Sequence, residues 1–190
     1  MKRILIVLAF SLLLVNCSND NYTPKPKAQL RLAYPKPNYQ KQYFDYFSFE
    51  KSDLAKIEKV SNKRINLLYP NMKATIYLTY NKVEKNLDTL LRDAEKFTLE
   101  HTVKADEIIS RDFINQKNRV FGSINLVSGN AASQIQFHAT DSTSNFIDGS
   151  LYFYVQPNYD SIMPAVDYLR ADIGKLLETL RWKNLYSLSN

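Results

Sequence analysis

Few side chains in this chain are of the types that perform catalysis. Cys17 is the only cysteine, and the two histidines are His101 and His138. His101 falls on the apolar stripe of a helical pattern, which favours a hydrogen-bonded core histidine over a catalytic base. Two histidines are too few for a three-histidine zinc site, and no carboxylates stand at metal-ligand spacing near either one. We therefore expect no catalytic residue, no metal site and no cofactor.

Two loops contain oxygen-bearing side chains that deserve a test against known chemistry. Residues 129–133 (GNAAS) lack the G-x-S-x-G spacing of a nucleophile turn and lead into a strand pattern rather than a helix, so we do not expect a catalytic Ser133. Residues 141–145 (DSTSN) offer oxygen ligands, and a weak calcium site is one interpretation. The spacing is not that of an EF-hand, and we expect a turn with local side-chain hydrogen bonds.

Polar and aromatic side chains alternate with apolar ones near the C-terminal half of the chain. From Ser133 to Asp141 the inward positions are Ile135, Phe137 and Ala139. The outward positions, together with two tyrosines of the next strand, form our candidate interaction surface: Gln134, Gln136, His138, Thr140, Tyr152 and Tyr154. Tyrosine is enriched in protein interfaces because its ring buries well while its hydroxyl keeps a partner. Equally, such rings can cover the second face of a sheet under a helix.

A second group of tyrosines lies near the N-terminus, between prolines and lysines. Its members are Tyr22, Tyr34, Tyr39, Tyr43 and Tyr46. The same two interpretations apply to this aromatic arm: it contacts partners, or it covers a face of the sheet.

Cys17 follows a sequence pattern typical of a secretory signal. Lys2 and Arg3 precede a twelve-residue apolar run, Ile4 to Val15, and Cys17 follows almost at once. The run is shorter than the about 20 residues of a membrane-spanning helix and suits a cleaved signal. Residues 14–17 (LVNC) resemble a bacterial lipobox, although Asn16 departs from the usual small residue. We expect lipidation at Cys17, which would tether the protein to a membrane. The alternative is an ordinary signal peptide followed by a free thiol.

Composition and charge limit the classes of partner and the sources of stability that the chain can have. The formal net charge is +6, and removing Lys2 and Arg3 with residues 1–16 lowers it to +4. These charges are dispersed, so we expect no nucleic-acid partner. A single cysteine cannot form an intrachain disulfide, and stability must come from packing. We divide the chain into a signal peptide (1–16), a lipidated flexible tether (17–27), which is polar and proline-broken, and one domain (28–190).

The periodicity of the domain predicts mainly strands in its first half. Strands are expected at Gln29–Tyr34, Tyr43–Phe49 and Leu54–Val60. Arg64–Tyr69 and Ala74–Tyr80 should form a hairpin around a turn at Pro70-Asn71. Its inward face would carry Ile65, Leu67, Ala74, Ile76 and Leu78.

The second half combines helices and strands. Apolar residues spaced by three and four predict a long helix over Asn86–Ile109, with Asn86 as N-cap. Strands follow at Arg119–Val127, where Gly122 marks a close approach or bulge, at Ser133–Asp141 and at Asn145–Val155. A last helix begins with Ser161 as N-cap and lies on the sheet through a stripe of apolar residues: Ile162, Val166, Leu169, Ile173, Leu176 and Leu180. The fold class is therefore α+β: an antiparallel sheet of about six to eight strands packed against one long internal helix and a C-terminal helix.

Several ordered motifs resemble the gliding motility lipoprotein GldD family of Bacteroidetes. They are residues 77–80 (YLTY), 100–101 (EH), 129–137 (GNAASQIQF), 140–142 (TDS), 145–153 (NFIDGSLYF), 157–161 (PNYDS) and 178–183 (ETLRWK). The likeness runs from the lipobox to Lys183. The strand and helix order also resembles PsbP-like domains, which are non-enzymatic assembly factors, but this likeness is architectural only.

The family resemblance implies a lipid-anchored protein of the cell envelope, most naturally of the outer membrane, that is needed for gliding. It also implies partners among the other envelope proteins of the gliding and type IX secretion machinery, and it carries over no catalytic residue or cofactor. Our leading hypothesis is a non-enzymatic protein that supports assembly or stability of this machinery. A ligand- or glycan-binding envelope module is the second hypothesis, and an enzyme is the third. A pocket with converging polar groups would favour the second.

Overall fold

The computed structural model describes residues 34–100, 105–154 and 158–183. Outside these ranges lie the expected signal peptide, the lipidation site Cys17, the tether, Tyr22, His101 and most of the expected strand Gln29–Tyr34. Within the described ranges, no helix is both long enough and apolar enough to cross a membrane.

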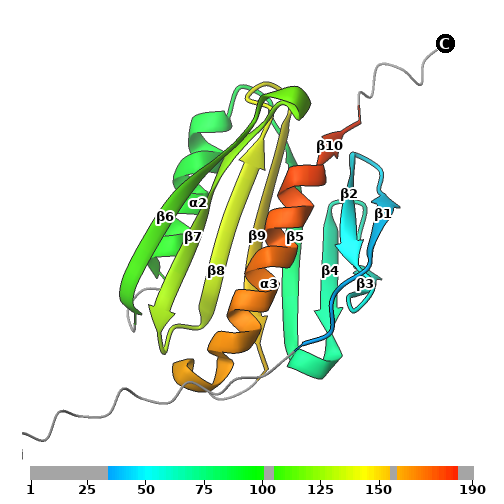
Figure 1. Ribbon diagram of the computed structural model, residues 1–190. Helices are drawn as coiled ribbons and strands as arrows, with labels where there is room; N and C mark the ends of the chain where they lie inside the picture. The colour runs from blue at the N-terminus through cyan, green and yellow to red at the C-terminus, as the bar shows by residue number, and fades with distance from the viewer. Residues whose placement is uncertain (1–33, 101–104, 155–157, 184–190) are drawn as a thin grey trace, which may run out of the picture.

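The architecture is α+β, as the sequence predicts (Figure 1). A seven-stranded antiparallel sheet has the order β3 (Lys56–Lys59), β4 (Arg64–Tyr69), β5 (Ala74–Lys82), β9 (Asn145–Phe153), β8 (Ser133–Thr140), β7 (Val120–Gly129), β6 (Ala105–Asn115). A smaller antiparallel sheet has the order β1 (Tyr39–Tyr43), β2 (Phe47–Ser52), β10 (Arg181–Trp182). The two α-helices of the described chain are α2 (Leu87–Glu100) and α3 (Tyr159–Thr179), and single turns of 3-10 helix lie at Pro70–Met72 and Gln116–Asn118.

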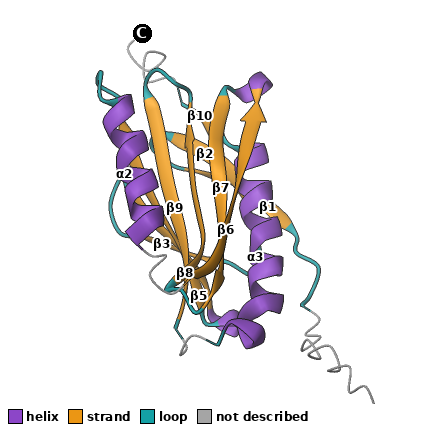
Figure 2. Cartoon of the chain, turned by 90° about the vertical axis from the view of Figure 1, so that its left-hand side faces the viewer, coloured by secondary structure: helices purple, strands orange, loops and turns teal. Residues whose placement is uncertain are grey.

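The two helices cover opposite faces of the large sheet (Figure 2). The apolar face lies under α3, and β2 of the small sheet also packs against this helix. All six residues of the predicted stripe on the last helix are buried there. The inward residues of the predicted hairpin, which is β4 and β5, are buried as well. The hydrophobic core therefore lies on the α3 side, and the alternation in the sequence identified it correctly.

Gly122 confirms a second prediction, the close approach of two strands. A Cβ atom on Gly122 would lie 1.9 Å from the backbone oxygen of His138 on the neighbouring strand. No side chain fits in that space, so β7 can pair with β8 at this distance only through a glycine.

The predicted helix Asn86–Ile109 is confirmed as far as Glu100 and is wrong over its last residues, 105–109. The helix α2 ends at Glu100, and residues from Ala105 onward form β6, which pairs with β7 along its whole length. Asn86 does precede the first helical residue, and its carbonyl accepts from the backbone N–H of Leu90. Its side chain, however, accepts from the backbone N–H of Glu84 rather than from the helix.

Two further boundaries differ from the prediction. The predicted strand Tyr43–Phe49 contains the end of β1, a turn and the start of β2, closed by a hydrogen bond from Phe44 N–H to the carbonyl of Phe47. The last helix begins at Tyr159 with Asn158 as N-cap, not at Ser161. Pro164 is consequently the sixth helical residue, beyond the first turn, and has no N–H to donate to the carbonyl four residues before it.

Candidate functional site

The face of the large sheet under α2 is polar, in contrast to the apolar face under α3. Strand register aligns Tyr77, Ser150, Gln136 and Asn125 across β5, β9, β8 and β7. The adjacent row on the same face aligns Thr79, Asp148, His138 and Ser123. A sheet face covered by a helix is ordinarily apolar, because burying it drives the packing. This face instead presents hydrogen-bonding groups to the helix.

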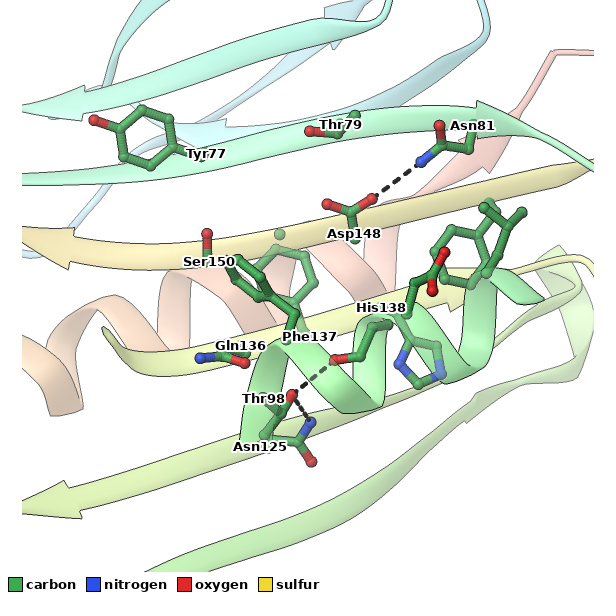
Figure 3. Close-up of a pocket in the computed structure, with 16 residues that line it drawn as sticks. Tyr77, Thr79, Asn81, Thr98, Asn125, Gln136, Phe137, His138, Asp148 and Ser150 are labelled. Carbon is green, nitrogen blue, oxygen red and sulfur yellow. Dashed lines mark hydrogen bonds between the residues drawn. The ribbon is translucent and has the colours of Figure 1, made fainter. Parts of the chain in front are cut away.

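The helix α2 covers this face only in part. Its sole fully buried residue is Thr98, and Leu87, Leu90, Leu91 and Ala94 are half-buried. Thr98 is also hydrogen-bonded to the sheet, since Asn125 Nδ2 donates to Thr98 Oγ1 over 3.2 Å. Between the helix and the sheet lies a cavity of about 450 Å³ (Figure 3). Its volume falls within the roughly 300–1,000 Å³ typical of small-molecule sites.

Gln136 lies in the wall of this cavity. Its side chain is only 3% exposed, and neither amide atom has a hydrogen-bond partner among the described residues. Leaving a buried polar group without a partner costs about 1–3 kcal/mol, and such groups are rare in folded proteins. The packing of the described chain therefore does not explain why the Gln136 amide is buried.

Two titratable side chains stand beside Gln136. Asp148 accepts a hydrogen bond from Asn81 Nδ2 at 3.1 Å, and burial raises the pKa of its carboxyl from 3.8 to about 6. Burial also lowers the pKa of His138, so its imidazole is neutral at pH 7. The His138 ring stacks on Phe146, with the ring centroids 5.7 Å apart. The site is thus largely uncharged apart from its carboxylates.

Ser123, His138 and Asp148 have the residue types of a catalytic triad. Ser123 Oγ lies 3.3 Å from Nδ1 of His138, and Asp148 stands opposite His138 in the strand register. In a triad the carboxylate orients the base by accepting its ring N–H. Here the hydrogen bond described for Asp148 comes from Asn81, and Figure 3 shows it directed toward β5. This arrangement does not match the geometry of nucleophilic catalysis.

The predicted interaction surface is divided by the structure. Gln134, Gln136 and Thr140 are buried rather than exposed to solvent, and Gln134 lies at an irregularity in the pairing of β8 with β9, between Ser133 and Ile135. Gln134 Nε2 donates to the carbonyl of Ala131, and Thr140 Oγ1 donates to the carbonyl of Asn145, so both have structural partners. Only Gln136 and His138 of the predicted set line the cavity.

The two predicted tyrosines lie beside the cavity and do not line it. Tyr152 is half-buried, with its ring edge-on to Tyr77 at 5.7 Å between centroids. Tyr154 is 61% exposed, and its hydroxyl lies 2.5 Å from that of Tyr77. The tyrosine pair therefore forms one end of the site, with one ring open to solvent.

The aromatic arm mostly packs on the domain. Tyr34 contacts Tyr168 at 5.2 Å between ring centroids, Tyr46 stacks on Tyr80 at 4.2 Å, and the Tyr39 hydroxyl donates to Asp172. Tyr43 alone among the described members is largely exposed. For most of this arm, covering the body of the protein is the observed role.

The loop at residues 141–145 is a turn held by its own side chains, as expected. Asp141 Oδ1 accepts from the backbone N–H groups of Thr143, Ser144 and Asn145, over 2.8–2.9 Å. Its other oxygen accepts from Asn145 Nδ2 at 2.7 Å. Across the described ranges, no cluster of three or more His, Cys, Asp or Glu could hold a metal ion.

Sequence reasoning missed the part of the site contributed by β5 and α2. Tyr77, Thr79 and Asn81 alternate with the inward residues of β5, so their common face was deducible. Which helix would cover that face was not, because β5, α2 and β8 meet only in the folded chain.

Comparison with known proteins gives one clear result. A family model described as "Gliding motility lipoprotein GldD" matches residues 19–182, which is most of the chain. A search of curated proteins found no match.

Proposed function

Because the chain belongs to the gliding motility lipoprotein GldD family, we propose that it supports assembly or stability of the gliding and type IX secretion machinery through protein contacts. The observation that carries this proposal is the family match itself, which extends from the N-terminal region to the last strand of the domain. In this proposal the protein is non-enzymatic and is held at the outer membrane by a lipid on Cys17, with other envelope proteins of that machinery as its partners.

The open edge of the large sheet is the surface that best fits such contacts. β6 is an eleven-residue edge strand, and no described strand pairs with its outer side (Figure 1). It exposes Ile109 and Ile114, the latter to 67%. An edge of this length can accept a strand from another protein, with main-chain hydrogen bonds providing affinity.

Crosslinking in the native envelope tests the proposal. A photo-reactive residue in place of Ile114 should crosslink to an envelope protein of the gliding machinery, whereas one in place of Tyr43 should not. Tyr43 is a matched control, because it is 68% exposed on β1 of the small sheet. Ile114→Lys should reduce gliding of the complemented deletion strain, and Tyr43→Lys should leave it unchanged.

Two outcomes would contradict the proposal. Normal gliding of the deletion strain would remove the role in motility. If gliding were lost but no crosslink to any envelope protein formed from Ile114 or from other exposed positions, the role through protein contacts would be wrong.

Ligand binding is a second candidate function, and the cavity beside Gln136 favours it. A protein purified from its own envelope would then retain a small molecule. Native mass spectrometry should detect a bound mass that is lost when Gln136 is replaced by Met. A spectrum with only the mass of the acylated chain would count against this second function.

A further inference from the structure

We propose that the cavity between α2 and the polar face of the large sheet binds a neutral, polyhydroxylated ligand of the size of a mono- or disaccharide. This inference deepens the second proposed function, ligand binding, and rests on it.

Gln136 supplies the central recognition group. Its amide offers one donor group and one acceptor side by side, and both are buried and unpartnered within the described chain. Adjacent hydroxyls on a sugar ring can donate to and accept from such an amide at the same time. Figure 3 shows Gln136 between Ser150 and the Thr98–Asn125 pair, so further hydrogen-bonding groups flank it on both sides.

The charge of the wall excludes anionic ligands. The described residues that line the cavity include two carboxylic acids, Asp93 and Asp148, and no lysine or arginine. A phosphate or carboxylate placed there would meet like charge, and the nearest cation with an electrostatic effect on this wall, Arg64, already acts on Asp148 and does not line the cavity. The remaining polar groups are neutral amides, hydroxyls and an imidazole, which both donate and accept, as a polyol requires.

A fixed carboxylate suits a polyol. Asp148 Oδ1 already accepts from Asn81 Nδ2, and the backbone N–H of Asp148 also bonds to the carboxyl group, so the carboxylate is held in place, and a carboxylate oxygen has lone pairs for more than one donor such as a ligand hydroxyl. On the other side of the cavity, Asn125 Nδ2 and Oδ1 are engaged by Thr98 and Ser110, so Asn125 holds the helix rather than the ligand.

Aromatic rings provide the apolar surfaces that the C–H faces of a sugar need. Tyr77 and Phe97 line the cavity from β5 and α2, whereas Phe146 of β9 is 1% exposed and its ring is already stacked on His138. Phe97 is 42% exposed, which is high for a phenylalanine on the covered side of a helix. Packing of a ligand against these rings would bury apolar area in addition to the hydrogen bonds.

Ligand titration of the full chain in detergent tests this inference. The probes are neutral saccharides, namely glucose, galactose, mannose, N-acetylglucosamine, cellobiose and N,N′-diacetylchitobiose, with glucuronic acid and spermidine as charged probes. Saturation-transfer NMR and calorimetry should show binding of at least one neutral saccharide. Gln136→Met should weaken that binding by about tenfold or more.

A matched variant separates recognition from folding. Gln134 lies on the same strand and is equally buried, but it donates to the Ala131 carbonyl and does not line the cavity. Gln134→Met should lower the melting temperature and keep saccharide affinity within about twofold. Gln136→Met should raise the melting temperature of the free protein, because it removes buried amide atoms that have no partner.

Three results would overturn the inference: no neutral saccharide binds, only a charged probe binds, or Gln136→Met binds as well as the wild type. Each leaves the motility role intact, because that role is tested by gliding and crosslinking. A bound molecule of another class, retained from the envelope, would preserve ligand binding and refute only the saccharide assignment.

Discussion

Two buried polar side chains of this domain, Asp172 and Gln136, differ in whether they have hydrogen-bond partners among the described residues. On the α3 side, Asp172 is buried, yet its two oxygens accept from the hydroxyls of Tyr39 at 2.7 Å and Tyr69 at 3.0 Å. On the α2 side, Gln136 has no such partners. Both are polar groups removed from water, but only Asp172 has hydrogen bonds that offset its desolvation. The contrast separates a structural polar residue from a candidate binding residue.

Asp148 should make the stability of the protein depend on pH. Burial raises its folded-state pKa from 3.8 to about 6, so between these values the folded state holds more protons than the unfolded state. Stability therefore falls as the pH rises from about 4 to about 6 and then stays at the lower level. Asp148→Asn should flatten this part of the curve and stabilise the protein at pH 7.5 by about 1–3 kcal/mol in urea titrations.

Asp53 provides a control of opposite sign for that experiment. Hydrogen bonds from the backbone and side chain of Asn38 lower the pKa of Asp53. Its contribution to stability is present at neutral pH and is lost as the pH falls through the lowered pKa. Asp53→Asn should therefore destabilise the protein at pH 7.5. A change of the same sign in both variants would show that net charge, not burial, controls the response.

The Asp172 network gives a second prediction at this scale. Tyr69→Phe removes one donor from a buried carboxylate and should destabilise the protein by about 1–2 kcal/mol at pH 7. The loss should shrink at low pH, because burial raises the pKa of Asp172 and the protonated group needs fewer donors. Chemical denaturation at pH 7 and at pH 4 measures both effects. Equal losses at the two pH values would mean that the hydroxyl acts through packing alone.

At the scale of the elements, substitution by alanine should have opposite effects on stability at two glycines, Gly122 in β7 and Gly174 in α3. Gly122→Ala would place a methyl group 1.9 Å from the backbone oxygen of His138, so β7 and β8 would have to separate. We expect a loss of about 2–3 kcal/mol. Gly174 lies inside α3 with nothing within 4 Å of an added Cβ, and Gly174→Ala should gain about 0.5–1 kcal/mol of helix stability. Thermal unfolding of both variants checks the pair, and two changes of the same sign would contradict this account.

The elements also show what the sequence could and could not predict. Period-two alternation located β4, β5, β8 and β9 and the face of each that enters the core, because that pattern is a direct result of one-sided burial. The continuation of the helix to Ile109 was wrong for a related reason. Ala105 and Ile108 fit a helical spacing, but pairing of β6 with β7 decides their structure, and a single-sequence pattern does not contain that partner.

The candidate site was only half predictable for the same reason. Alternation placed Gln136 and His138 on the second face of the sheet. It could not show that α2 covers that face, because coverage depends on contacts between residues far apart in the chain. Burial therefore separates the predicted polar residues into two groups: Gln134 and Thr140 have structural hydrogen bonds, whereas Gln136 lies in a cavity wall without a partner among the described residues.

At the scale of the whole molecule, membrane attachment and ligand binding would depend on separate parts of the chain. Acylation of Cys17 would fix where the protein lies, while the domain from Tyr34 onward would determine what it contacts. Cys17→Ser should therefore move the protein from the membrane fraction to the aqueous fraction, since a mature lipoprotein depends on its acyl chains for attachment. Gliding should fall with the loss of anchoring, while saccharide titration and thermal unfolding of the domain should match the wild type. Fractionation with immunodetection, read beside those two measurements, tests the separation. Membrane retention of Cys17→Ser would contradict attachment through the lipid alone. Protein contacts, such as those proposed for the β6 edge, would then have to hold the molecule in the envelope.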